Sequence, residues 1–222
     1  MIELINFTLK DLINPVFYID HGGIWIVMFI IFAETGLMVG FFLPGDSLLL
    51  LSGVYSSKLM ESVIHNGLEN DFIEVMMLFV LISLAGILGN ELGYWIGFKT
   101  GPVIFKRKDS WLFKKKYLYQ AKEFYDKHGD IAIVLARFLP MLRTFSPIVA
   151  GIVKMDKKSF LRYNILGSAA WVFSILMAGH YLERLFLDNF GFDLKEHVFA
   201  IIILLLLTTT GPVVYKMFSR KE

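Results

Sequence analysis

Two acidic residues and a Pro-Gly pair interrupt the first long apolar stretch of the chain. Residues 31–51 read IFAETGLMVGFFLPGDSLLLL, in which Glu34 lies inside the apolar run and Asp46 directly follows the Pro-Gly pair. Proline removes a backbone donor, and together with glycine it interrupts a helix. Non-helical backbone is tolerated at membrane depth only where protein or a water-filled cavity satisfies its polar groups. The stretch therefore predicts a re-entrant helical hairpin over residues 24–57.

The composition of the whole chain indicates that its solvent is lipid. Of its 222 residues, 56% are hydrophobic, which is more than a water-soluble domain of this length needs to fill its core. The chain has no cysteine, which excludes disulfide frameworks, thiolate metal sites and cysteine nucleophiles. We expect an all-α polytopic membrane protein that forms a single membrane domain over residues 1–222, with no metal and no cofactor.

Four further apolar stretches and an N-terminal segment complete the predicted organisation. A spanning helix needs about 20 apolar residues, and ordinary spans are expected at residues 75–98, 160–182 and 198–217. Residues 131–153 contain two prolines and charged residues close to the break, and they predict a second re-entrant hairpin. Residues 1–23 mix charged residues with apolar ones and predict an N-terminal amphipathic interfacial helix, with no cleavable signal peptide.

The distribution of basic residues predicts the topology, because cytoplasmic loops are enriched in Lys and Arg. Residues 99–130 carry nine basic and four acidic side chains, so we expect a cytoplasmic basic segment. Residues 58–74 and 183–197 are net acidic and fit the outer side, whereas the C-terminal tail is basic and is expected in the cytoplasm. The two halves are then inverted, each with a hairpin, a polar connection and a span, as in many secondary transporters. The span at 198–217 has no counterpart.

The acids of the first hairpin are candidate proton-coupling residues. An acid within the hydrocarbon costs roughly 3 kcal/mol even on the lenient insertion scale, so Glu34 is expected to be partnered or functional. Asp46 also stands where the N-cap acceptor of a helix belongs, and capping remains an alternative role for it.

The second hairpin supplies the candidate phosphate-binding residues. Arg137 and Arg143 flank a proline and are followed by Thr144 and Ser146. The arginine side chain stays charged and presents a planar fork of donors that suits phosphate oxygens. These four residues predict a clamp for a phosphoryl head group. The alternative is that the two arginines only neutralise the two acids of the first hairpin in buried ion pairs, without a ligand.

Other polar positions carry weaker signals. Asn90 and Glu91 form an additional polar site in a glycine-rich run, whose glycines favour close helix packing; Glu91 also lies near enough to the basic segment to be solvated. Asn164 and Trp171 fit interior polar groups of the later span. The basic and aromatic stretch 106–119 binds anionic lipid more simply than RNA, so no nucleic acid partner is expected.

Catalysis is not predicted. The sequence has no paired-histidine metal motif, no Asp-rich magnesium cluster and no histidine beside the arginines to accept a phosphoryl group, so we expect neither catalytic residues nor an enzyme. A membrane lipid phosphatase therefore has little support from the residues.

Several motifs together resemble the DedA family, the bacterial branch of the SNARE-associated or VTT-domain membrane proteins. The resemblance covers most of the chain and rests on Glu34-Thr35-Gly36, Phe42 to Leu49, Gly89 to Gly101, Ala136 to Pro140 with Arg143, and Asn164 to Trp171. It implies a lipid carrier of the cell envelope, chiefly for undecaprenyl phosphate, with other members moving phosphatidylethanolamine or affecting proton balance and drug tolerance. It also implies proton-linked roles for Glu34 and Asp46. Asn90 stands where many relatives carry Asp.

The function predicted from these features is a flippase-type lipid transporter. We expect it to move undecaprenyl phosphate across the bacterial inner membrane with proton coupling, as a multi-pass protein with a cytoplasmic C-terminus. Its predicted partners are a phosphate-bearing lipid, protons and the bilayer, and a homo-oligomer is left open. Two alternatives remain: a scramblase or carrier for phospholipids of the phosphatidylethanolamine type, and a proton-coupled ion or drug transporter.

Overall fold

The computed structural model describes residues 15–37, 45–64, 70–106, 131–137 and 140–190. All regular elements in these ranges are helices, which confirms the predicted all-α class. In chain order the helices are α1 Pro15–Gly36, α2 Gly45–Val54, α3 Ser56–Glu61, α4 Asp71–Lys106, α6 Ile131–Arg137, α7 Pro140–Ile152 and α8 Lys157–Phe190.

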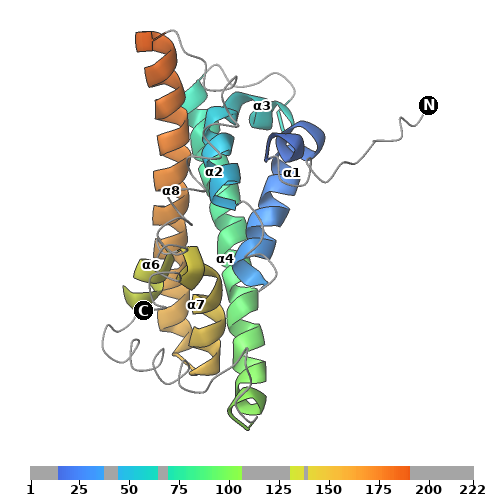
Figure 1. Ribbon diagram of the computed structural model, residues 1–222, viewed down its shortest axis with the longest axis vertical. Helices are drawn as coiled ribbons and strands as arrows, with labels where there is room; N and C mark the ends of the chain where they lie inside the picture. The colour runs from blue at the N-terminus through green and yellow to red at the C-terminus, as the bar shows by residue number, and fades with distance from the viewer. Residues whose placement is uncertain (1–14, 38–44, 65–69, 107–130, 138–139, 191–222) are drawn as a thin grey trace, which may run out of the picture.

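Two long helices, α4 and α8, form the frame of the molecule. They contain 36 and 34 residues, which at about 1.5 Å per residue makes each about 50 Å long, well beyond the roughly 30 Å of a hydrocarbon core. Figure 1 shows them running along the long axis, with α1, α2 and α3 around the upper half and α6 and α7 around the lower half.

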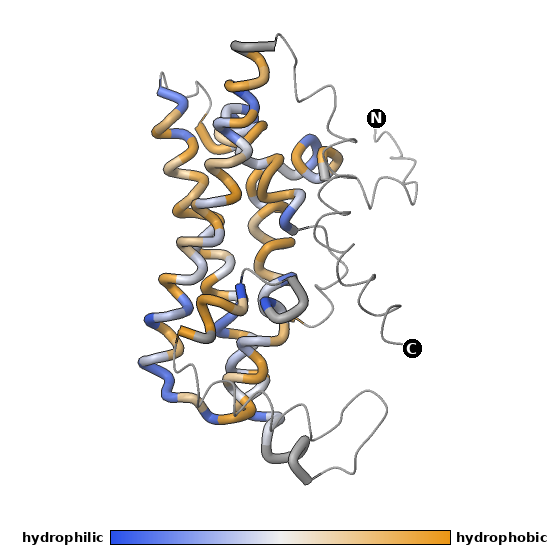
Figure 2. The backbone as a smooth tube through the Cα atoms, turned by 60° about the vertical axis from the view of Figure 1, so that its left-hand side comes forward, coloured by the Kyte–Doolittle hydropathy of each residue, from blue (hydrophilic) through white to orange (hydrophobic). Residues whose placement is uncertain are grey.

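Three helices are long and apolar enough to cross a membrane, judged by length and composition: Val16–Gly36, Asp71–Gly101 and Lys157–Leu187. The second and third contain the predicted spans at 75–98 and 160–182. Large apolar side chains point outward from both long helices, as a lipid solvent requires; they include Val80, Leu84, Leu88, Leu166 and Phe173. Figure 2 shows apolar residues along most of the length of these helices.

The first helix differs from the predicted division of the N-terminal region. α1 begins at Pro15 and kinks at Gly23, where φ is +52°, so one helix joins the end of the predicted interfacial segment to the first arm of the predicted hairpin. A side chain at Gly23 would be strained at this φ and would also lie 2.8 Å from the Ser62 hydroxyl oxygen. Residues 1–14, both predicted hairpin tips, most of the basic segment and the span at 198–217 lie outside the described residues, and these predictions are not tested.

The two halves of the chain make equivalent contacts. The first half has the broken helix pair α1 and α2 and the long helix α4, and the second half has the broken helix pair α6 and α7 and the long helix α8. In each pair the first helix packs on the long helix of its own half, α1 on α4 and α6 on α8, and the second helix packs on the long helix of the other half, α2 on α8 and α7 on α4. Glycines mark the crossings. A Cβ atom at Gly53 or Gly179 would overlap a carbonyl oxygen across the α2–α8 contact, and a Cβ at Gly97 or Gly151 would do the same across α4–α7. This correspondence is expected of structurally related repeats.

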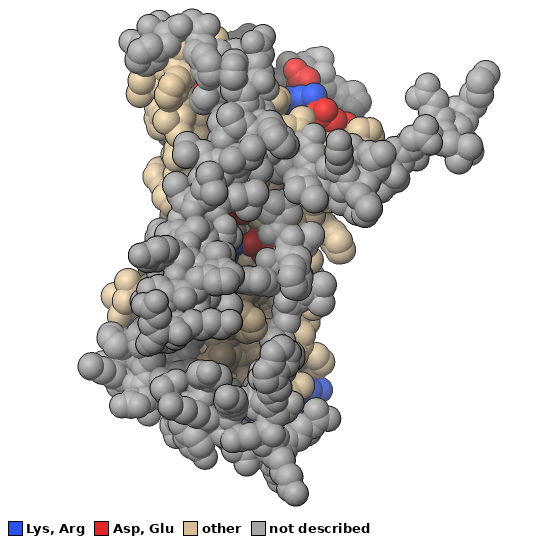
Figure 3. Space-filling view, viewed as in Figure 1, with Lys and Arg blue, Asp and Glu red and all other residues tan. Residues whose placement is uncertain are grey.

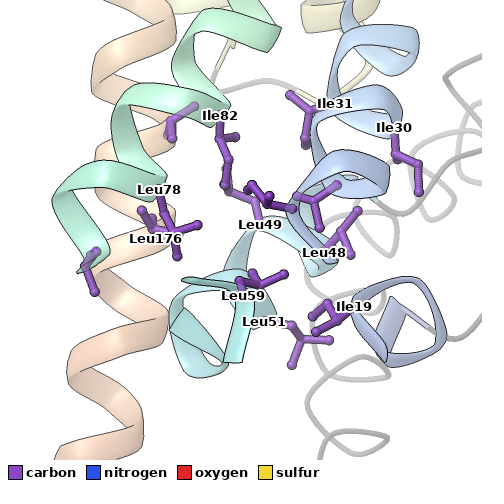
Figure 4. Packing of buried hydrophobic residues seen from close by; sticks show 14 of the residues in the cluster. Ile19, Ile30, Ile31, Leu48, Leu49, Leu51, Leu59, Leu78, Ile82 and Leu176 are labelled. Carbon is purple, nitrogen blue, oxygen red and sulfur yellow. The ribbon is translucent and has the colours of Figure 1, made fainter. Parts of the chain in front are cut away.

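Buried apolar side chains hold the broken helices against the frame. The larger cluster lies between α1, α2, α3, α4 and α8 (Figure 4) and includes Ile31, Leu48, Leu49, Leu78 and Leu176. A smaller cluster, formed by α4, α6, α7 and α8, comprises Tyr94, Ile133, Ala150 and Phe160. Along α4 and α8, the residues between the two clusters include the buried polar side chains described next.

Candidate functional site

Arg143 joins the two broken helix pairs. It lies in the first turn of α7, where its Nη2 donates to Glu34 Oε1 at the end of α1 and its Nη1 donates to Asp46 Oδ1 at the start of α2. Arg143 and Glu34 are buried, and the Asp46 side chain is 21% exposed. The structure thus brings together three of the four predicted charged residues in two ion pairs on one guanidinium.

Trp171 of α8 supports these ion pairs from one side. The Arg143 Cζ atom lies 4.5 Å from the centroid of the indole ring, within the range of a cation–π contact. The indole Nε1 donates to Asp46 Oδ1 over 3.1 Å. Because Trp171 is fully buried, it fixes the guanidinium and one carboxylate at the same time.

The two oxygens of the Glu34 carboxylate differ in their contacts with the described residues. Its Oε1 accepts from Arg143, whereas its buried Oε2 has no hydrogen-bond partner among the described residues. The carboxylate lies directly against the backbone of Gly45, so closely that a Cβ atom there would overlap Oε2. The glycine of the Pro-Gly pair therefore makes room for the acid, in addition to interrupting the helix.

Arg137 has a different environment from Arg143. It is the last residue of α6 and is 3% exposed. Its Nη1 donates to Ser168 Oγ over 2.6 Å and its Nη2 donates to Asn164 Oδ1. Among the described residues no carboxylate forms an ion pair with Arg137, and its Nε has no hydrogen-bond partner. The arrangement in which each arginine neutralises one acid is therefore not what the described part of the chain shows.

One face of α8 contacts both arginines. Asn164, Ser168 and Trp171 follow one another at spacings of four and three residues, which places them on the same side of a helix. From the sequence, Asn164 and Trp171 are expected to be interior polar groups, and Ser168 carries no prediction. The signal that could have found all three is this helical spacing of polar and aromatic residues within an apolar span.

Asn90 and Glu91, the additional polar site predicted on α4, have different partners in the structure. The Asn90 amide Nδ2 donates to the Gly86 carbonyl of its own helix over 2.7 Å. Glu91 is partly buried, and its Oε1 lies 3.5 Å from the Asn164 Nδ2, which also donates to the Ile87 carbonyl over 3.1 Å. Glu91 is thus linked to Arg137 through Asn164.

Thr144 and Ser146 follow Arg143 in α7 and are buried, 2% and 7% exposed. Their assignment as phosphate ligands stays a prediction.

Figure 3 shows charged atoms recessed at mid-height of one face of the molecule, well away from the charged atoms at its upper edge.

Comparison with known proteins places the chain in a family. The family description VTT domain matches residues 43–181, a range that includes Asp46, both arginines and Trp171. Protein DedA of Escherichia coli K12 is 38% identical over 181 residues, covering 80% of this chain and 78% of that protein. An uncharacterized membrane protein of Mycobacterium tuberculosis H37Rv is 32% identical over 215 residues, covering 94% and 90%.

A third relative also covers more than two thirds of this chain. Inner membrane protein YqjA of Escherichia coli K12 is 31% identical over 166 residues, covering 73% of this chain and 69% of that protein. No solved structure matches the chain. The family match over more than half of the chain and the extended identity to these relatives lead to one conclusion: the chain belongs to the DedA family of VTT-domain membrane proteins.

Proposed function

We propose that the protein is a transporter that moves a phosphate-bearing lipid, in the first place undecaprenyl phosphate, across the bacterial inner membrane with coupling to protons and without chemical change to the lipid. The observation that supports this most is the buried guanidinium of Arg143, which holds Glu34 and Asp46 together between the two broken helix pairs. Charged side chains inside a membrane protein are expensive and usually mark a substrate or ion pathway.

The balance of charge explains why anion movement and protonation are coupled in this proposal. The formal charges of Glu34, Asp46, Arg137 and Arg143 cancel. A phosphate monoester adds a charge of about −1.5 to −2 near neutral pH, which a low-dielectric interior tolerates poorly. Uptake of one or two protons by the acids restores neutrality.

The geometry offers a place for the first proton. Glu34 Oε2 is buried and has no hydrogen-bond partner among the described residues, so it accepts a proton without competing for a donor. A protonated Glu34 then holds Arg143 less strongly, because a charge-assisted hydrogen bond becomes a neutral one. The guanidinium is freed as the phosphate arrives.

The lipid tail requires no enclosed site in this proposal. The outward-facing residues of α4 and α8 are apolar, including Leu88 and Leu166. A polyprenyl chain can therefore stay in the bilayer while the head group passes through the protein interior.

Transport in proteoliposomes tests the proposal. Purified full-length protein is reconstituted with undecaprenyl phosphate on one leaflet, and movement of the head group is followed with and without an imposed pH gradient. We expect movement that responds to the gradient and is lost in Arg143→Ala, while Lys58→Ala, which removes only the exposed pair with Asp20, leaves it unchanged. Unchanged transport in Arg143→Ala contradicts the proposal.

Two further readings in the same assay separate the rival functions. Competition by phosphatidylethanolamine as strong as that by undecaprenyl phosphate, with no response to the gradient, indicates a phospholipid scramblase. Inorganic phosphate released from undecaprenyl phosphate indicates an enzyme. The proposal predicts neither result.

A further inference from the structure

The two buried arginines differ in the countercharges that surround them. Arg143 donates from both terminal nitrogens to carboxylates and lies over the indole of Trp171. Arg137 donates from both terminal nitrogens to neutral groups, the Ser168 hydroxyl and the Asn164 amide oxygen. Both are almost completely buried, but only one has an anionic partner within the described residues.

We propose that Arg137, together with Asn164 and Ser168, is a standing anion-binding site for a phosphate group, and that Arg143 is the neutralised partner, which becomes available only after its acids are released. This inference rests on the proposed function, because it assigns different roles to two residues of the same transport site. The ligand chemistry is a tetrahedral phosphate, whether on a lipid or free in water.

Arg143 is a poor first contact for an anion. An incoming phosphate would meet the negative charges of Glu34 and Asp46 at the same guanidinium. Removing the anionic partner of a buried cation is strongly unfavourable. A phosphate therefore displaces the carboxylates only when protonation has weakened them.

Arg137 has the opposite properties. A buried cation without a countercharge is costly, and an anion that pairs with it relieves this cost. Its partners are groups that an anion can replace, since hydrogen bonds between a cation and neutral acceptors are weaker than those to a phosphate or carboxylate. The Nε atoms of Arg137 and Arg143 both have no hydrogen-bond partner in the described part of the chain, so the two arginines differ in their countercharge and not in a free donor.

The surrounding groups orient Asn164 toward Arg137 and leave space for the arginine side chain. The Asn164 Nδ2 faces the Ile87 carbonyl and the Glu91 carboxylate of α4, which directs Oδ1 toward Arg137. Gly167 leaves room for the side chain, because a Cβ there would lie 2.7 Å from Arg137 Cδ and 2.8 Å from Nε. An aspartate at position 164 would instead supply a permanent internal anion at hydrogen-bonding distance.

That contrast provides the test, because Asn164→Asp is an isosteric change that substitutes for the ligand. Full-length protein in detergent micelles is heated with farnesyl phosphate, with farnesol or with inorganic phosphate, and the Tm is recorded against ligand concentration. We expect the wild type to be stabilised by one or both phosphates and not by farnesol. In Asn164→Asp the apparent affinity for phosphate should fall by at least about tenfold, as expected for the loss of a charge-assisted contact.

Matched variants keep the result interpretable. Asn90→Asp makes the same change at another buried asparagine, whose amide binds the Gly86 carbonyl of its own helix, and it should retain the phosphate-dependent rise in Tm. Arg137→Gln removes the buried charge and should lose that rise, which preserves the test if Asn164→Asp does not fold. The triple variant Glu34→Gln, Asp46→Asn, Arg143→Gln, which leaves no carboxylate without its cation, should retain it.

The outcomes that overturn the inference are distinct from failure of the transport proposal. Equal stabilisation by farnesyl phosphate and farnesol, wild-type phosphate affinity in Asn164→Asp or Arg137→Gln, or loss of binding confined to the triple variant would each refute the role of Arg137. Phosphate binding at Arg137 without lipid movement in proteoliposomes would refute the transport proposal alone.

Discussion

The indole ring of Trp171 lies against the guanidinium of Arg143, with the Arg143 Cζ 4.5 Å from the ring centroid. The same ring donates its N–H to Asp46 Oδ1, so a single side chain of α8 contacts both members of an ion pair that joins α2 to α7. Trp171 is therefore a positioning residue for the charge cluster.

Replacing Trp171 by phenylalanine tests the polar part of this role. Phe keeps an aromatic face for Arg143 and removes the donor to Asp46, so we expect a loss of about 1 kcal/mol of stability and slower lipid movement. Trp171→Ala should cost about 3–5 kcal/mol, because it also opens a cavity. Thermal unfolding in detergent measures both, and Trp95→Phe on the exposed face of α4 is the control. Equal stability of Trp171→Phe and Trp95→Phe would show that the indole N–H is unimportant.

Neutralising the whole cluster should separate folding from transport. Arg143→Ala alone leaves two carboxylates without their cation, and we expect it to destabilise the protein by about 3–5 kcal/mol. The triple variant Glu34→Gln, Asp46→Asn, Arg143→Gln removes the charges together and should recover most of that stability while remaining inactive in lipid transport. Thermal unfolding and the proteoliposome assay, run on the same preparations, give the two readings. A triple variant with normal transport would show that the charges are only structural.

Gly45 is predicted to be essential because of its contact with Glu34. A Cβ at position 45 would overlap the carboxylate, so Gly45→Ala should displace Glu34 from Arg143 and reduce the response of transport to a proton gradient several-fold. Gly86→Ala is the matched control on α4, because a Cβ there would meet its nearest neighbour, Ile31, at an ordinary 3.8 Å. If both variants behave alike, the close approach at Gly45 has no functional role.

The predicted topology can be tested directly because the chain contains no cysteine. Single cysteines at Lys58, in the net acidic region expected outside, and at Lys158, in the basic region expected inside, are both at exposed positions. A membrane-impermeant maleimide should label Lys58→Cys in intact spheroplasts and Lys158→Cys only after lysis. Labelling of both in intact spheroplasts would contradict the inverted arrangement.

The sequence predicts the helical frame well, whereas the pairing of the charged residues depends on tertiary structure. Spans at 75–98 and 160–182 follow from the length of the apolar runs, and both lie inside helices of the structure. Glu34 and Arg143 stand out because charges within apolar runs are rare. The kink at Gly23 is harder to predict, because the helix there packs close to Ser62, a tertiary contact that local sequence does not report.

The division between the two arginines also depends on tertiary structure. Arg137 and Arg143 look alike in the sequence, and only the packing of α6 and α7 against α8 decides which one meets carboxylates and which one meets Asn164 and Ser168. The helical spacing of Asn164, Ser168 and Trp171 predicts a shared face but not the partner of each residue.

In the proposed function, the buried charges carry a phosphate head group across the membrane in exchange with protons. The movement of undecaprenyl phosphate in proteoliposomes, measured for the wild type and Arg143→Ala with and without a pH gradient, tests this proposal. We expect the gradient to accelerate lipid movement in the wild type, and we expect no movement in the variant. Equal movement in both proteins, unaffected by the gradient, would contradict the proposal.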